Sequence, residues 1–353
     1  MNFKGLFWFL PAILFSLTGS AQPPAGYYNT AGNLTGIALK QALHGIIDNH
    51  AVVPYSDLMG YFRKTDVKND SLVWDMYSDN PGGAALYTYK FGKGQECGNY
   101  NSEADCYNRE HSFPKSWFNN ASPMYSDLFH IYPTDGYVNN RRGNYPYGET
   151  ESPTWTSQNG SKVGPCSAAG YSGIVFEPID EYKGDFARTI FYMAARYYTQ
   201  DNGWPGSDMV TGAEPKPWAA GLLLDWHRID PVSPKEILRN NEVFNIQKNR
   251  NPFIDDSDYA VKIWGRSSHT GKFSSAGTRL QVYPNPASDY FRLAFDLIEK
   301  CELLIYNQEG ILLLQYPDFN TTEKIDVRSL PGGLYLIRII SSGETRTGLF
   351  IRK

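Results

Sequence analysis

The stretch CYNREHSFPKSWF, residues 106–118, places an acid and an imidazole side by side at Glu110 and His111. It otherwise resembles a short β-strand that ends in a turn. In a regular strand, neighbouring side chains point to opposite faces. If Glu110 and His111 share one task, the backbone must depart from that pattern. We therefore expect a β-bulge or an irregular turn near Glu110, so that both side chains reach one cleft.

A second polar stretch follows at residues 125–149 and contains Asn139 and Arg142. A hard cation such as Mg²⁺ prefers oxygen ligands and is often held by one or two protein groups, so the Glu110 carboxylate and the Asn139 amide oxygen suit it. A neutral imidazole takes a proton from water near pH 7, which suits His111 to general-base work. The planar guanidinium of Arg142 suits a phosphate oxygen. Together these groups would hydrolyse a phosphodiester bond, because the metal stabilises charge on the phosphate and its leaving oxygen.

From the residues alone, other roles stay open. A Glu next to a His is more often an ion pair or a core histidine, Asn139 also suits a turn or a cap, and Arg142 also suits a solvated surface. His227, in DWHRIDP, lies in an apolar helical pattern and is expected to be a hydrogen-bonded core histidine. Asp127 and Asp135 are expected to orient loops or to cap the helix that carries Asn139.

The composition is that of a globular protein. A chain of 353 residues suggests two domains, or one large domain with an appendage. Hydrophobic residues make up 41% and aromatic residues 15%, enough for a sizeable core. The net charge of −4 is not typical of a nucleic-acid-binding protein, so a phosphate site would need local basic patches or a metal ion.

The N-terminal sequence MNFKGLFWFLPAILFSLTGSAQPP has the pattern of a secretory signal peptide, which we place at residues 1–21. Its apolar run, residues 6–17, is short for a membrane helix, which needs roughly 18 apolar residues, and no other stretch approaches that length. We therefore expect an exported, soluble monomer without a stable membrane span.

Export also permits disulfides among the cysteines at positions 97, 106, 166 and 301. Cys97 and Cys106 flank a loop rich in Gly, Asn and Ser, so we pair them, with free or differently paired thiols as the alternative. The partner of Cys166 stays open. The chain has no CxxC, so nothing supports a structural zinc site.

Hydrophobic periodicity predicts an α+β fold for the larger domain, residues 22–266, with most helices near its end. A β-hairpin is expected from residues 71–78 and 84–91, with a strand and turn at 107–118 and a short helix leading into a loop at 135–148. The expected longer helices lie at residues 37–50, 54–67, 180–199, 217–230, 233–249 and 255–265.

The composition changes at the Ser/Gly-rich segment 267–278, which we take as a linker. Short alternating strands follow over residues 279–353 and predict a small all-β sandwich. The motifs VYPNPASDYFRL and LPGGLYLIRI and the basic end FIRK resemble the C-terminal sorting domain of the type IX secretion system of Gram-negative bacteria. The resemblance implies that this machinery is a partner and exports the protein to the cell surface or the medium. A carbohydrate- or protein-binding β-module is the alternative.

Several blocks in the larger domain, in chain order, resemble the bacterial endonuclease I family: YNREHSFPKSW, SDLFHIYPTDGYVNNRRGNYPYG, GYSGIVFEPIDEYKGDFARTIFYM, WHRIDPVSPKEILRNN and IQKNRNPFID. The resemblance covers roughly residues 30–265. It implies a ββα-metal, or His-Me finger, nuclease core embedded in a helix-rich domain.

Carried over by position, the resemblance implies that Glu110 and Asn139 hold a divalent metal and that His111 activates the attacking water. The metal is expected to be Mg²⁺, with Ca²⁺ or Mn²⁺ as alternatives. A phosphate contact by Arg142 is a weaker inference. The implied activity is endonucleolytic cleavage of DNA, with RNA left open, at little sequence preference and with 5′-phosphate products.

Two departures from the family pattern stand out. Phe129 replaces a His in DLFH, so His130 receives no catalytic role. No Arg occurs between residues 118 and 127, where some members carry one that steadies the leaving group, and the sequence does not choose among Arg141, Arg142 and Lys115 as its substitute. The alternative function is a catalytically inactive surface protein that uses the same cleft to adhere to DNA or polysaccharide.

Overall fold

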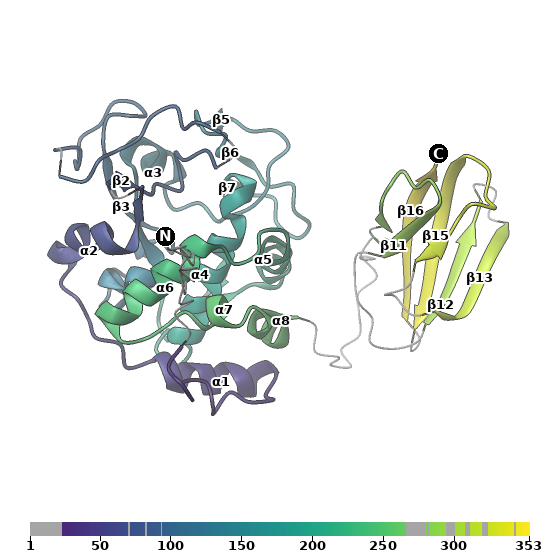
Figure 1. Ribbon diagram of the computed structural model, residues 1–353, viewed down its shortest axis with the longest axis horizontal. Helices are drawn as coiled ribbons and strands as arrows, with labels where there is room; N and C mark the ends of the chain where they lie inside the picture. Colours follow the sequence, from purple (N-terminus) through teal and green to yellow (C-terminus); the bar gives the residue numbers. More distant parts are fainter. Residues whose placement is uncertain are drawn as a thin grey trace, which may run out of the picture. The chain divides into compact units, whose positions relative to one another are not determined.

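The computed structural model describes residues 23–265, except 70, 82 and 93, and residues 280–353, except 281, 294–300, 308–310, 320–323 and 342–343. The expected signal peptide and linker lie outside these ranges. The chain forms two compact units, which divide between residues 268 and 269 (Figure 1). We call them the N-terminal unit and the C-terminal unit.

Helices dominate the N-terminal unit, and each of the expected longer helices is confirmed. The described helices are α1 (Gly36–Ile47), α2 (Leu58–Thr65), α3 (Gly136–Arg142), α4 (Lys183–Arg196), α5 (Pro217–Ile229), α6 (Pro234–Gln247), α7 (Pro252–Asp255) and α8 (Asp258–Trp264). The start of α6 shows how local sequence sets an element. Ser233 and Glu236 form a reciprocal capping box there, and Pro234 occupies the first helical turn.

Helix α4 is the centre of the N-terminal unit (Figure 1). All of its residues are buried, and it packs against α1, α5 and α7. Phe186, Ile190 and Phe191 are fully buried, and each such side chain stabilises the fold by roughly 1.5–3 kcal/mol relative to exposure. None of the helices in the described ranges is both long and apolar enough to cross a membrane.

The strands of the N-terminal unit are short and form several small sheets. They are β1 (Val67–Lys68), β2 (Leu72–Val73), β3 (Tyr107–His111), β4 (Ile131–Asp135), β5 (Trp155–Thr156), β6 (Lys162–Pro165), β7 (Ile174–Glu177), β8 (Val210–Thr211) and β9 (Glu214–Pro215). The antiparallel pairs are β1–β2, β3–β4, β5–β6, β6–β7 and β8–β9. The mixture of helices and short strands confirms the α+β class.

The predicted hairpin of residues 71–78 and 84–91 is wrong. Strand β2 pairs with β1 instead, and the second arm meets it only through a bridge between Leu72 and Lys90. The reason lies at Asp75, whose carboxylate accepts hydrogen bonds from the backbone N–H groups of Tyr77 and Asp135. These bonds turn the chain away from a strand and tie it to the end of β4.

The C-terminal unit consists of two antiparallel sheets. Its strands are β10 (Val282–Tyr283), β11 (Tyr290–Leu293), β12 (Cys301–Tyr306), β13 (Leu312–Phe319), β14 (Ile325–Asp326), β15 (Gly333–Ser341) and β16 (Glu344–Arg352). The sheet orders are β10–β11–β14 and β13–β12–β15–β16. Phe291 of the first sheet packs on Phe350 of the second with 4.6 Å between ring centres, so the sheets share one core.

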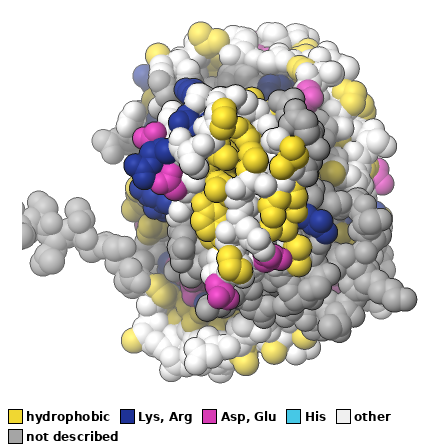
Figure 2. All heavy atoms as spheres, turned by 90° about the vertical axis from the view of Figure 1, so that its right-hand side faces the viewer, with side chains coloured by type: hydrophobic (Ala, Val, Ile, Leu, Met, Phe, Trp, Pro, Cys, Tyr) yellow, Lys and Arg dark blue, Asp and Glu magenta, His cyan; other side chains and the backbone are white. Residues whose placement is uncertain are grey.

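Hydrophobic side chains also gather on an outer face of the C-terminal unit (Figure 2). In the four-stranded sheet, Leu334 is paired with Ile351 and Leu336 with Leu349. Leu334, Leu336 and Ile351 are exposed, whereas the intervening Tyr335 and Phe350 are buried. The two faces of this sheet are therefore both apolar, although only one of them faces the core.

Candidate active site

The strands β3 and β4 and the helix α3 form the frame of the candidate site. Residues pair one to one along the two strands, with Glu110 opposite Tyr132 and His111 opposite Ile131. The expected bulge near Glu110 is therefore wrong. The strand keeps its normal alternation, and Glu110 and His111 find different partners on different sides of it.

The Glu110 carboxylate is buried and firmly held. Its Oε1 accepts a hydrogen bond from the Tyr77 hydroxyl at 2.9 Å and lies 3.2 Å from Nη1 of Arg142. Tyr77 and Arg142 both contact Oε1, and neither of these contacts involves Oε2 of Glu110. Burial raises the pKa of Glu110, while the charge of Arg142 and the hydrogen bond from Tyr77 oppose that rise.

Arg142 is fully buried beneath this carboxylate. Its guanidinium donates to the backbone carbonyls of His111, at 3.2 Å, and Ser112, at 2.7 Å, and lies over the Tyr147 ring. It therefore joins the last turn of α3 to the end of β3 and orients Glu110. These partners all belong to the protein, so a phosphate contact by Arg142 stays a prediction.

The His111 ring lies on the other side of the strand and is 5% exposed. Its Nε2 lies 3.1 Å from the Tyr125 carbonyl, which can only accept a hydrogen bond. Nε2 is therefore the N–H donor, and Nδ1 is the basic nitrogen. Burial, with a contribution from His130, lowers the pKa of His111 to about 3, so the ring is neutral at neutral pH.

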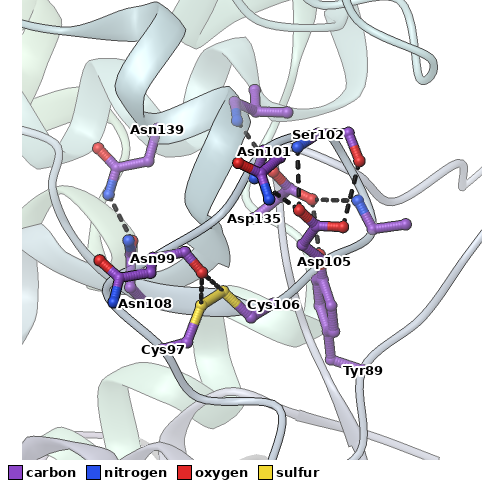
Figure 3. Close-up of a disulfide and its surroundings, with 12 residues drawn as sticks. Tyr89, Cys97, Asn99, Asn101, Ser102, Asp105, Cys106, Asn108, Asp135 and Asn139 are labelled. Carbon is purple, nitrogen blue, oxygen red and sulfur yellow. Dashed lines mark hydrogen bonds between the residues drawn. A yellow bond between two sulfur atoms is a disulfide. The ribbon is translucent and has the colours of Figure 1, made fainter.

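Asn139 lies in the middle of α3 and is half-buried. Both hydrogen bonds of its side chain in the described part of the chain leave from Nδ2, to the Arg109 carbonyl at 3.4 Å and to Asn108 Oδ1 at 2.7 Å (Figure 3). The amide oxygen is thus left for another partner. Asn108 and Glu110 lie two residues apart on one strand face, so Asn139 is held beside the strand segment that carries Glu110.

Asp135 fixes the start of α3, as expected from the sequence. Its Oδ1 accepts a hydrogen bond from the Val138 N–H, and its Oδ2 accepts from the Tyr89 hydroxyl and the Ala104 N–H (Figure 3). Asp127 orients its own loop and accepts from the Phe129 N–H at 3.0 Å. Both acids therefore position backbone rather than face the site.

A disulfide joins Cys97 and Cys106, with their Cα atoms 5.8 Å apart (Figure 3). Cys106 directly precedes β3, and its carbonyl accepts a hydrogen bond from the Gly136 N–H at the start of α3. The bridge therefore secures the point where strand and helix meet. Cys166 and Cys301, both within the described ranges, are free.

The donor set around Glu110 suits a hard divalent cation. Glu110 Oε2 and Asn139 Oδ1 are oxygen ligands of the type that Mg²⁺ prefers, and Mg²⁺ keeps several of its waters. No cluster of three or more His, Cys, Asp or Glu side chains that could hold a metal occurs in the described ranges. Glu110 and Asn139 thus offer two oxygens, a number that suits a cation held by few protein groups.

Several site residues were not predicted. Tyr77, Asn108 and Tyr125 each bind a predicted residue. Only Asn108 has a sequence signal, because it lies two residues before Glu110 and hence on the same strand face. Tyr77 and Tyr125 reach the site through tertiary packing that the local sequence does not reveal.

His227 behaves as the sequence predicts. It is buried, its Nε2 donates to the Ser257 carbonyl at 2.9 Å, and its Nδ1 lies 3.2 Å from Arg188 Nη1. Burial, together with the charge of Arg188, lowers the pKa of His227 to about 4. It is a core histidine whose hydrogen bonds go to Ser257 and Arg188 rather than to Glu110 or His111.

Two cations lie next to the His111 side of the strand. Arg109 stacks over the Tyr55 ring at 4.2 Å, and the exposed Lys115 lies 5.8 Å from the centre of the Tyr125 ring. Both tyrosine rings in turn contact the His111 ring. Positive charge is thus available at the surface beside His111, where Arg142 supplies none.

Comparison with known proteins covers both units. Residues 35–258 match the family model of endonuclease I, and residues 281–353 match that of a secretion system C-terminal sorting domain. The chain is 36% identical to an extracellular ribonuclease of Bacillus amyloliquefaciens, over 71% of this chain and 84% of that protein.

Two further relatives show the same similarity. An extracellular ribonuclease of Bacillus subtilis (strain 168) is 33% identical over 71% of this chain and 83% of its own length. A protein named endonuclease-1 from Buchnera aphidicola subsp. Baizongia pistaciae (strain Bp) is 24% identical over 57% of this chain and 69% of its own length.

Proposed function

Because the chain belongs to the endonuclease I family, we propose that this nuclease is a divalent-metal-dependent endonuclease that hydrolyses phosphodiester bonds of DNA, and of RNA as well, with little sequence preference. One observation carries the proposal. Strand β3 bears Glu110 and His111, and the helix that follows its partner strand bears Asn139. That order of strand, strand and helix supports a ββα-metal nuclease core.

Glu110 and Asn139 would hold the metal through Oε2 and Oδ1. A bound Mg²⁺ would stabilise negative charge on the scissile phosphate and on its leaving oxygen. The protein contributes a carboxylate fixed by Tyr77 and Arg142 and an amide fixed by Asn108. Ligands that are already held lose little freedom on binding, which favours metal affinity.

His111 would take the proton of the attacking water at Nδ1. Because β3 has no bulge, we propose that the scissile phosphate lies across the end of the strand, with the metal at Glu110 on one side of it and the water at His111 on the other. The Tyr125 carbonyl fixes the tautomer by accepting from Nε2–H. Burial keeps the ring neutral at neutral pH, and a base must be neutral to accept a proton. Attack at phosphorus with departure of the 3′ oxygen leaves a 5′-phosphate on the product.

Lys115 is the cation best placed to contact the phosphate. It is exposed, it lies against Tyr125 beside His111, and the 3₁₀ turn Lys115–Phe118 follows the strand that carries Glu110 and His111. Arg142 would act instead as a positioning residue that orients Glu110. In this arrangement Lys115 contacts the substrate, and Arg142 holds the Glu110 carboxylate.

The C-terminal unit supports export. The match of residues 281–353 to a secretion system sorting domain and the extracellular relatives indicate a protein that is secreted or held at the cell surface. We propose that the type IX secretion machinery carries it there, after a signal peptide at residues 1–21 has been removed.

The test is cleavage of plasmid DNA and of a single-stranded RNA by the purified protein, with millimolar Mg²⁺ or with chelator. We expect cleavage of both with metal, none with chelator, and 5′-phosphorylated ends. His111→Ala should lower the rate at least about 100-fold, the usual effect of removing a general base. Glu110→Gln should also lower the rate, because it removes the charged ligand of the metal that stabilises the phosphate. Intact nucleic acid at every metal concentration tested would instead favour an inactive adhesion protein.

A further inference from the structure

We propose that an open pocket at the end of α3 binds an unpaired nucleobase of the substrate strand. The pocket has a volume of about 800 Å³, and its lining includes Asn144, Tyr145, Tyr171, Ile174, Pro205 and Asp208. The inference rests on the proposed function, since it adds a subsite for the same nucleic-acid substrate. It makes single-stranded nucleic acid the preferred substrate class.

The pocket is tied directly to the candidate active site. Asn144 and Tyr145 follow α3, and the Tyr145 N–H donates to the Arg142 carbonyl. On another side, the Gly206 N–H donates to the carbonyl of Trp117, in the turn that follows His111. A strand whose phosphate lies at His111 would therefore pass close to the pocket with its neighbouring nucleotides.

Tyr171 lines one wall of the pocket and is stacked from behind by Trp218, which is not part of the lining. The Tyr171 and Trp218 rings lie 4.7 Å apart and 11° from parallel. Asp208 holds both, because its carboxylate accepts from the Tyr171 hydroxyl at 3.1 Å and its carbonyl accepts from Trp218 Nε1 at 2.9 Å. Rings that are fixed before binding lose little entropy when a base packs against them.

Glycine makes the position of Tyr171 possible. A Cβ atom on Gly173 would lie 2.1 Å from the Tyr171 hydroxyl oxygen, so any other residue there would displace the ring. Tyr145, in the same pocket, is 41% exposed, an unusual amount for so large a ring. The pocket thus presents aromatic surface that no side chain of the described ranges covers completely.

Charge distinguishes a base from a phosphate as the occupant. In the described chain, the lining of the pocket contains no Lys or Arg and one carboxylate, Asp208. A phosphate would be repelled there, whereas a base offers a π-face for stacking and N–H groups for a carboxylate acceptor. Bases within a duplex are already stacked and paired, so the pocket favours single strands.

The test measures binding without cleavage. A fluorescein-labelled single-stranded DNA octamer is titrated with the full chain in excess chelator, and the Kd is read by anisotropy. We expect Tyr171→Ala and Tyr145→Ala each to raise the Kd by about 5- to 150-fold, the usual loss per stacked base. Tyr171→Phe, which keeps the ring, should bind within about twofold of wild type, as should Tyr290→Ala, an equally exposed tyrosine in the C-terminal unit at 40%.

An octamer with abasic sites at every position separates bases from backbone. Wild type should bind it at least as weakly as Tyr171→Ala binds the intact octamer, and Tyr171→Ala should bind it no more weakly than wild type does. A Kd unchanged by both alanine substitutions would overturn the proposal. Cleavage by the same wild-type preparation is measured separately, so inactivity would count against the nuclease function while the binding result still decides the subsite.

Discussion

At the scale of single residues, the site combines a carboxylate and an amide that are each fixed through one end. Arg142 and Tyr77 hold Glu110 by Oε1, and Asn108 holds Asn139 by Nδ2. These contacts restrict rotation of both side chains and so fix the direction of the free oxygen of each group. If Glu110 and Asn139 bind a metal as proposed, two ligands fixed in this way can select a cation that keeps most of its water.

The role of Asn108 can be tested by metal titration. Asn108→Ala removes the acceptor that orients Asn139, so we expect the Mg²⁺ concentration for half-maximal cleavage to rise about 10- to 100-fold, as for other residues that orient metal ligands. Asn108→Asp keeps an acceptor and should restore most of the affinity. Asn140→Ala, an exposed neighbour on α3, is the matched control. Equal Mg²⁺ requirements for Asn108→Ala and wild type would show that Asn139 needs no such support.

Arg142 and Lys115 should separate stability from activity. Arg142→Met leaves the Glu110 carboxylate buried without its ion pair, which costs roughly 3–5 kcal/mol, so the Tm measured by calorimetry should fall by about 6–20 °C. Lys115→Ala removes an exposed cation and should leave the Tm within about 2 °C. It should nevertheless lower kcat/KM by about 10-fold or more, because a phosphate contact is lost. A large fall in Tm for Lys115→Ala, or none for Arg142→Met, would contradict this division of roles.

At the scale of elements, the N-terminal unit depends on charged groups packed around the start of α4. Asp230, at the end of α5, accepts a hydrogen bond from the Gly184 N–H at 2.8 Å. Burial, reinforced by the charge of Asp185, raises the pKa of Asp230 to about 7. A carboxyl with a raised pKa in the folded state stabilises the fold below its unfolded pKa, and that stability is lost as the pH rises through about 7.

Asp230→Asn should therefore stabilise the protein in a pH-dependent way. The amide oxygen can still accept from Gly184, but it cannot ionise. With an allowance for partial exposure of the group, we expect the variant to melt about 2–4 °C above wild type at pH 8 and at the same temperature near pH 4. Glu181→Gln, an exposed carboxylate before α4, is the control and should show no such trend. A Tm difference that is constant across this range would rule out titration of Asp230 as its cause.

The helices could be predicted from the sequence because their signals are local. The period of apolar residues and the Ser233–Glu236 box place α4, α5 and α6 without any tertiary information. The local sequence could not show that the predicted hairpin after residue 71 does not form. The cause is a long-range hydrogen bond, in which Asp75 accepts from the Asp135 N–H at the start of α3, 60 residues further along the chain. The same holds in the site, where the resemblance supplied Glu110, His111 and Asn139, while only packing revealed that Arg142 is buried.

At the scale of the whole molecule, each unit has a hydrophobic core of its own. Buried residues such as Phe186 and Ile190 form the core of the N-terminal unit, and Phe291, Ile337 and Phe350 belong to that of the C-terminal unit. A core that is complete within one unit does not need the other for folding. The residues proposed to act in catalysis also all lie in the N-terminal unit, so export and catalysis should be separable.

A chain of residues 23–265 should therefore fold and cleave nucleic acid like the full protein. We expect its Tm to lie within about 2 °C of the matching transition in the full chain, and its kcat/KM on a single-stranded substrate within about twofold, because no core residue of the unit is lost. Phe291→Ala in the full chain is the complementary change. It leaves a cavity in the core of the C-terminal unit and should lower the stability of that unit by roughly 3–5 kcal/mol. Calorimetry should therefore show a lower Tm for the C-terminal unit, while the Tm of the N-terminal unit and the activity stay unchanged. A shortened chain that melts more than about 5 °C lower, or a Phe291→Ala protein that loses activity along with its C-terminal unit, would show that the two units stabilise each other.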